Sequence, residues 1–160
     1  MKRSVCLLLL LSLLLLPSCS RNERSAEDVF SAISEKLPTL SFGKLYLSGR
    51  TAGDATFMSP ALFESLFGVD APPLVEEYAI YLSSFALPCE VAVFKCFSPS
   101  DTSRIERACL SRLDLLRRNF KGTEQESAID SAYLTKKGRF VVFIVSAGAD
   151  GICGEVERLL

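Results

Sequence analysis

The stretch Cys89-Glu-Val-Ala-Val-Phe-Lys-Cys-Phe97 decides the fold, because Glu90 and Lys95 are the only charged residues in an otherwise apolar run. Ahead of it, large apolar side chains recur at every second position from 78 to 82, which is the period of a β-strand. Pro88 lies between the two segments, and proline belongs in a connection rather than in the middle of a strand. The pattern therefore predicts an antiparallel hairpin over residues 76–97.

A second hairpin is predicted further along the chain. Its second strand, Phe140-Val-Val-Phe-Ile-Val145, is apolar on both faces, as expected of a strand that is covered on both sides. Residues 132–135 form its first strand, and Lys136-Lys-Gly138 supplies the turn between the two.

Two amphipathic helices accompany the hairpins. One is predicted over residues 26–37, because Ser25-Ala-Glu-Asp28 has the spacing of a capping box and Pro38 stops the run. The other is predicted over residues 101–120, with Lys121-Gly122 as its stop. Apolar side chains keep helical spacing in both, at Val29, Phe30, Ile33 and Leu37 and at Ile105, Cys109, Leu113, Leu116 and Phe120.

Shorter elements complete the order. Ser59-Pro60 is typical of a capped helix start, and Gly68 ends that short helix. One helical turn is expected within 123–130 and a terminal helix over 152–160. Residues 39–57 are ambiguous, because their alternation suits short edge strands at 40–42 and 45–47 while glycines interrupt it.

The fold class that follows is α+β. We expect an antiparallel sheet of about four strands packed against helices, in the order α-(α)-ββ-α-ββ-α. About 140 residues remain after the first 18–20, which suits one domain over residues 25–160.

The first residues predict export from the cytoplasm. Met1-Lys2-Arg3-Ser4 is followed by about twelve nearly unbroken apolar residues and then by small ones, which is the order of a secretory signal. This run is short for a helix that must cross ~30 Å of hydrocarbon. Residues 1–18 are therefore predicted to be a signal peptide.

Leu16-Pro17-Ser18-Cys19 is similar to the lipobox of bacterial lipoproteins. The likeness implies that Cys19 is acylated and that residues 19–24 are the lipidated cysteine and a short tether. Two or more acyl chains anchor a protein stably, whereas one does so only marginally. Cleavage after Ser20 with simple secretion and a retained anchor helix are the alternatives.

Charge and composition exclude several functions. Without Lys2 and Arg3, 16 basic side chains face 19 acidic ones, a net charge of −3, so nucleic-acid binding is not expected. The chain has no histidine, which removes Ser-His-Asp and Cys-His nucleophile pairs and histidine-ligated zinc. We expect no catalytic residue, metal or cofactor, and the sequence does not identify ligand-binding residues.

Four cysteines remain after Cys6 and Cys19: Cys89, Cys96, Cys109 and Cys153, which allow three pairings. Cys89 and Cys96 cannot bridge, because seven strand residues of ~3.3 Å separate them by roughly 23 Å on opposite faces. A bridge from Cys96 or Cys109 to Cys153 stays open. The favoured interpretation is that all four are small buried hydrophobic side chains.

Two candidate enzyme chemistries lack the full set of residues that they need. Ser41-Phe-Gly-Lys44 has the S-x-x-K spacing of a penicillin-binding nucleophile, but the companion motifs of those enzymes are missing. A glycosidase needs two carboxylates at a set separation, and nothing in the sequence fixes such a separation. The acidic residues that we expect instead at strand ends and in solvated loops are Glu76, Glu77, Glu90, Glu124 and Glu126.

Binding of anionic wall polymer or lipid headgroups is one interpretation of the cations of the helix over 101–120. They occur on several faces, which favours a solvated surface. These cations are Arg104, Arg107, Arg112, Arg117, Arg118 and Lys121.

Several short motifs together resemble the domain-of-unknown-function family numbered 4358, whose members are lipoproteins found mainly in anaerobic Gram-positive bacteria. They are the lipobox, the capped helix over 26–37, Glu77-Tyr78, Ser84, Glu90-Val-Ala-Val-Phe-Lys95, Arg112 and Lys137-Gly138-Arg139-Phe-Val-Val-Phe. The resemblance covers roughly residues 25–160. It implies an extracytoplasmic domain and no particular activity, so no catalytic residue follows from it.

The sequence therefore predicts a membrane-anchored extracytoplasmic lipoprotein. The bilayer is the expected partner of acylated Cys19, and a non-catalytic domain is expected to bind a ligand, an envelope protein or a wall polymer. The alternatives are an enzyme on cell-wall or glycan substrates that uses carboxylates or Ser/Lys, and a structural accessory that docks on a membrane protein.

Overall fold

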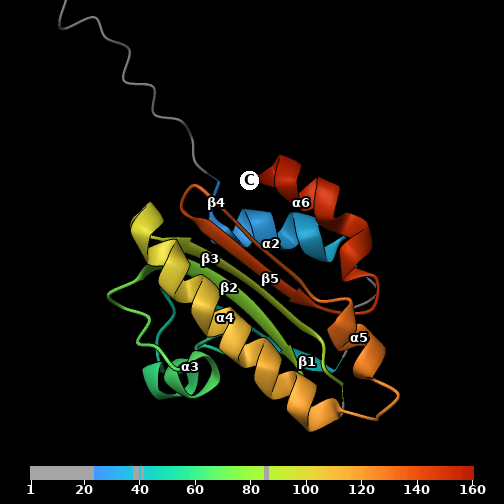
Figure 1. The fold of residues 1–160 in the computed structure, drawn as a ribbon. Coiled ribbons are helices and arrows are strands. Elements are labelled where there is room, and N and C mark those ends of the chain that lie inside the picture. The colour runs from blue at the N-terminus through green and yellow to red at the C-terminus, as the bar shows by residue number, and fades with distance from the viewer. Residues whose placement is uncertain (1–23, 38–39, 41, 85–86) are drawn as a thin grey trace, which may run out of the picture.

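A five-stranded antiparallel sheet lies at the centre of the computed structural model, which describes residues 24–37, 40, 42–84 and 87–160 (Figure 1). The strand order is β1-β2-β3-β5-β4. The strands are β1 (Gly43–Leu47), β2 (Val75–Ser83), β3 (Glu90–Cys96), β4 (Tyr133–Lys137) and β5 (Phe140–Val145). Both predicted hairpins are present, and the α+β class is confirmed.

The sheet has five strands rather than about four, and β1 is the additional one. It pairs with β2 from Gly43 opposite Ser83 to Leu47 opposite Ala79. The expectation of a further strand at 40–42 was wrong at the residues described, because Phe42 turns into a left-handed backbone conformation with φ 63°. Such a conformation ends an extended run.

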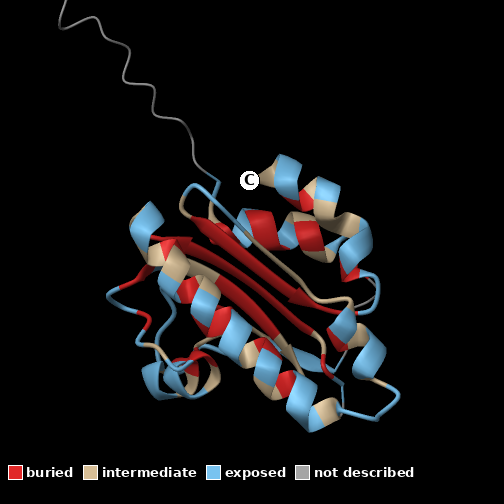
Figure 2. Cartoon of the chain, in the orientation of Figure 1, coloured by how far each residue is buried: buried red, intermediate tan, exposed pale blue. Residues whose placement is uncertain are grey.

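Helices cover both faces of the sheet. On one face lie α3 (Pro60–Phe67), α4 (Pro99–Phe120) and α5 (Glu126–Asp130), and on the other lie α2 (Ala26–Ser34), the 3₁₀ turn η1 (Ala149–Ile152) and α6 (Cys153–Leu159). Strands β3 and β5 are therefore buried along their whole length, as Figure 2 shows. None of the helices between residues 24 and 160 that the structure describes is long and apolar enough to span a membrane.

Alternation along the strands divides the core into two layers. Phe94 and Phe143 face α3 and α4, where Phe94 meets the rings of Phe63 and Phe67 edge-on at 6.0 and 5.3 Å. Val93 and its neighbours on the opposite face pack against α2. The apolar run Phe140–Val145 thus contributes to both layers.

Local signals set most helix ends. The capping box of Ser25 and Asp28 starts α2, as predicted. The same helix ends at Ser34, three residues earlier than predicted, because the Lys36 amide bonds to the Ile33 carbonyl in a tighter turn. Gly68, with φ 67°, ends α3.

Candidate functional site

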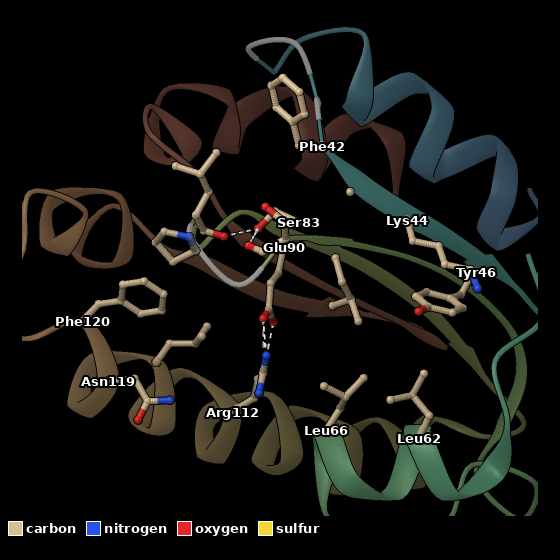
Figure 3. A pocket seen from close by; sticks show the side chains of 16 residues that line it. Phe42, Lys44, Tyr46, Leu62, Leu66, Ser83, Glu90, Arg112, Asn119 and Phe120 are labelled. Carbon is tan, nitrogen blue, oxygen red and sulfur yellow. Dashed lines mark hydrogen bonds and ion pairs between the residues drawn. The ribbon is translucent and has the colours of Figure 1, made fainter.

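A groove of about 610 Å³ lies between α3, α4 and the edge of the sheet formed by β1 and β2. Figure 3 shows side chains from all these elements converging on it. Most of the lining is apolar, contributed by Phe42, Tyr46, Leu62, Leu66, Leu82, Leu87, Leu116 and Phe120. The volume is in the range of sites that hold small organic ligands or a few side chains of a partner.

One ion pair crosses the groove from sheet to helix. Nε of Arg112 in α4 donates to both carboxylate oxygens of Glu90 in β3, at 3.2 and 3.1 Å, and Nη2 also contacts Oε1. The side chains of Arg112 and Glu90 are only 15% and 7% exposed. Two largely buried charges are tolerated because each neutralises and hydrogen-bonds the other.

The helical phase of α4 places Arg112 in the groove. Ile105, Cys109 and Leu116 are buried against the sheet, and a residue three positions after Cys109 and four before Leu116 lies on the same stripe. The expected solvated surface was therefore wrong for Arg112. The position of this arginine among the apolar residues of the stripe was the signal in the sequence. The other cations predicted for this helix and its C-terminal end are exposed: Arg104, Arg107, Arg117, Arg118 and Lys121.

Glu90 was expected at a solvated strand end and is buried instead. It lies on the same side of β3 as Ala92 and Phe94, because side chains alternate along a strand. Burial of a carboxylate without a cation carries a large free-energy cost, so β3 and α4 depend on each other here.

The rim of the groove carries two exposed apolar side chains. Phe42 is 81% exposed and Leu87 is 44% exposed. Phe42 holds its position through its carbonyl, which accepts from the Ser84 amide at 2.8 Å. A Cβ at Gly43 would lie 2.2 Å from the ring of Tyr81, so only glycine follows Phe42 without displacement.

A second cation lies beside the groove. The Lys44 ammonium is 4.9 Å from the centre of the Tyr46 ring, a cation–π contact. Arg112 keeps its Nη1 without a hydrogen-bond partner within the described part of the chain. Because Glu90 balances only one of the two cations, the lining has a net positive charge.

The other candidate carboxylates lie apart from this groove. Glu77 pairs with Lys95 at 3.2 Å and also accepts from the Ala26 amide at 2.8 Å, while Glu76 pairs with Arg139 at 2.6 Å. Glu124 is exposed, and Glu126 accepts from the Gly122 amide at 2.9 Å. Of these five carboxylates, Glu90 alone is among the described residues that line the groove. Lys95 is 6% exposed as a residue, so both charges of the β3 run lie inside the protein.

The cysteines Cys89, Cys96, Cys109 and Cys153 are free thiols. Cys96 and Cys109 lie in the layer under α4, whereas Cys153 starts α6 on the opposite face of the sheet. The sheet therefore separates the partners of the bridge that the sequence left open. Cys96 and Cys109 are buried as expected, but Cys89 and Cys153 are only half-buried.

Some predicted positions lie outside the described residues. They are the signal peptide 1–18, the lipid attachment site Cys19, the tether up to residue 23, and Ser41 of the S-x-x-K tetrad. In the described part of the chain, no three Cys, Asp or Glu side chains are grouped to hold a metal ion.

A family model for a domain of unknown function, DUF4358, matches residues 53–146. The chain belongs to the DUF4358 family. The match extends from before α3 to the residue after β5 and includes Glu90 and Arg112, while α2, β1 and α6 lie outside it. No curated protein and no solved structure matches the chain. In this DUF4358 domain, four of the charged residues in the motifs that resemble the family form two ion pairs, Glu77–Lys95 and Glu90–Arg112.

Proposed function

We propose that this DUF4358 protein is a non-catalytic binding lipoprotein, anchored in the cell membrane through acylated Cys19 and exposed on the extracytoplasmic face. The groove between α3, α4 and β1 is its binding site for a ligand or partner protein. The observation that carries the proposal is a largely apolar groove whose single carboxylate, Glu90, is already neutralised by Arg112.

The polar groups of the groove support binding rather than chemistry. General acid–base work on a glycan needs two carboxylates, and Glu90 is the one carboxylate among the described lining residues. The Ser83 hydroxyl contacts the Leu87 carbonyl and accepts from the Cys89 amide at 3.1 Å. The hydroxyl is therefore engaged in the connection between β2 and β3, and no described carboxylate or amine side chain is hydrogen-bonded to it.

The position of the groove also suits an anchored receptor. The start of α2 contacts Glu77 through the Ala26 amide, and Glu77 pairs with Lys95 near the end of β3. Glu90, at the groove, is five residues earlier in β3, or about 17 Å along the strand. The five residue-to-residue steps from Cys19 to Arg24 span at most about 18 Å. An anchor at Cys19 would therefore be attached closer to the Glu77 end of the sheet than to the groove.

Two experiments test the two parts of this proposal. Cells expressing the full chain are labelled with a palmitate analogue; the label should appear on the membrane-bound protein and disappear in Cys19→Ser. Recovery of unlabelled protein from the cytosol would refute the anchor.

For the groove, a photoreactive phenylalanine analogue replaces Phe42 in living cells. The matched position is Phe97, which is 53% exposed and lies outside the groove. A covalent adduct is expected at position 42 only; equal or absent adducts would refute the groove as the binding site.

A further inference from the structure

We infer that the groove binds a polypeptide segment of an envelope partner, in which apolar side chains stand next to an acidic side chain or a terminal carboxylate. This inference rests on the proposed function and names the partner chemistry of the same groove. It is carried by three features of the lining: its charge, its rim and its walls.

The net positive charge of the lining favours an anionic group on the ligand. Lys44 is exposed and holds its ammonium over Tyr46, and Arg112 uses Nε and Nη2 for Glu90 while Nη1 has no partner within the described residues. An acidic group that enters the groove is attracted by either cation and offsets the positive charge that Glu90 leaves unbalanced. A cationic group would meet two like charges, which disfavours its binding.

The exposed apolar side chains of the rim favour a ligand that extends beyond the groove. Phe42 is 81% exposed, and its backbone adopts a positive φ, which is a costly conformation for a residue other than glycine. Leu87, also on the rim, is 44% exposed. A small acid held inside the groove leaves both side chains in water, whereas a polypeptide that continues over the rim covers them. Aromatic side chains covered in this way supply much of the affinity at protein interfaces.

The walls accept apolar side chains. Leu62 and Leu66 of α3 line one side and Leu116 and Phe120 of α4 line another, as the close view shows for the α3 pair and Phe120 (Figure 3). This arrangement, two helices beside a sheet edge, leaves room for side chains that project from an extended segment. The occupant is therefore a segment of mixed apolar and acidic composition rather than a uniformly charged wall polymer.

The test measures fluorescence anisotropy with the purified full chain in detergent. The probes are fluorescein-labelled peptides of equal length that share leucine and phenylalanine and carry glutamate, lysine or serine between them. The glutamate peptides should bind, and the lysine peptides should not. Phe42→Ala and Lys44→Glu should each weaken glutamate-peptide binding at least about tenfold. The matched variants Phe97→Ala and Lys121→Glu change exposed residues outside the groove. They should leave binding within about twofold.

Several outcomes overturn the inference. Lysine peptides that bind as tightly as glutamate peptides would contradict the charge argument, and groove variants that behave like their matched variants would place the contact elsewhere. Dodecanoate that binds and is lost in Lys44→Glu, with no peptide binding, would assign the groove to a small lipid acid. In that last case the inference fails while the photo-adduct at position 42 still supports the proposed function.

Discussion

Arg112 in α4 and Glu90 in β3 are 22 residues apart in the chain and form one largely buried ion pair, with Nε 3.2 and 3.1 Å from the two carboxylate oxygens. The pair joins the long helix to the central strand and separates the apolar walls of the groove. Removal of one partner therefore affects the fold and the groove together.

Arg112→Leu should lower the free energy of unfolding by about 3–5 kcal/mol, because it leaves the buried Glu90 carboxylate without a cation. Combining it with Glu90→Leu should recover most of the loss, since the pair is then replaced by apolar side chains. The exposed Arg117, 3.3 Å from Asp114, provides the control, and Arg117→Leu should cost about 0–1 kcal/mol. Urea unfolding measures all of these variants. Equal costs at positions 112 and 117 would contradict the assignment of a buried pair.

Glu77→Ala should loosen α2 as well as lower stability. The Glu77 carboxylate neutralises Lys95, whose side chain is 8% exposed, and accepts from the first amide of α2. Loss of both contacts is expected to cost about 2–4 kcal/mol. Hydrogen exchange followed by mass spectrometry should show that the substitution accelerates exchange, relative to the parent protein, more in residues 26–34 than in α4. Uniform acceleration in both helices would mean that Glu77 does not secure α2 specifically.

Two glycine-to-alanine substitutions should change the free energy of unfolding in opposite directions. Gly43→Ala should destabilise by about 1–3 kcal/mol, because the new Cβ would lie 2.2 Å from the Tyr81 ring and something must move. Gly154→Ala lies in α6, where nothing is within 4 Å of the new Cβ, and should stabilise by up to about 1 kcal/mol. Thermal unfolding gives both values. A neutral Gly43→Ala would show that β1 is not held closely against Tyr81.

Stability should fall at alkaline pH because of the buried thiols. Burial raises the pKa of Cys96 from 9.0 to about 11 and also raises the pKa of Cys109. Above pH 9 the unfolded chain ionises these thiols while the folded protein keeps them neutral. The free energy of unfolding therefore decreases with pH, by at most about 1.4 kcal/mol per unit for each thiol.

Urea unfolding under reducing conditions between pH 8 and 10.5 tests this expectation. The Cys96→Ala and Cys109→Ala double variant is the comparison, because all tyrosines stay in place. Its stability should decline less steeply than that of the parent protein. Parallel declines would rule out the thiols as the cause.

Several features of the fold could be predicted from local residues. The capping box at Ser25 and Asp28, the turn at Gly138 and the doubly apolar run Phe140–Val145 specify their elements through short-range contacts, and all were confirmed. β1 was harder to predict, because a short edge strand with a single neighbour has little pattern of its own. The residues that place it are in β2, which supplies its hydrogen bonds.

The amino-acid sequence alone determined the α+β class, the hairpins, the starts of α2 and α3 and the absence of histidine chemistry, since these follow from composition and from neighbours within a few residues. Only the tertiary structure decided that Glu90 and Arg112 meet, that Phe42 stands on a groove rim and that the sheet separates Cys153 from Cys96 and Cys109. The physical reason is that the burial of a side chain depends on which two elements of the fold pack against each other. A charged residue on an apolar stripe shows no partner until a strand and a helix distant in the chain pack together.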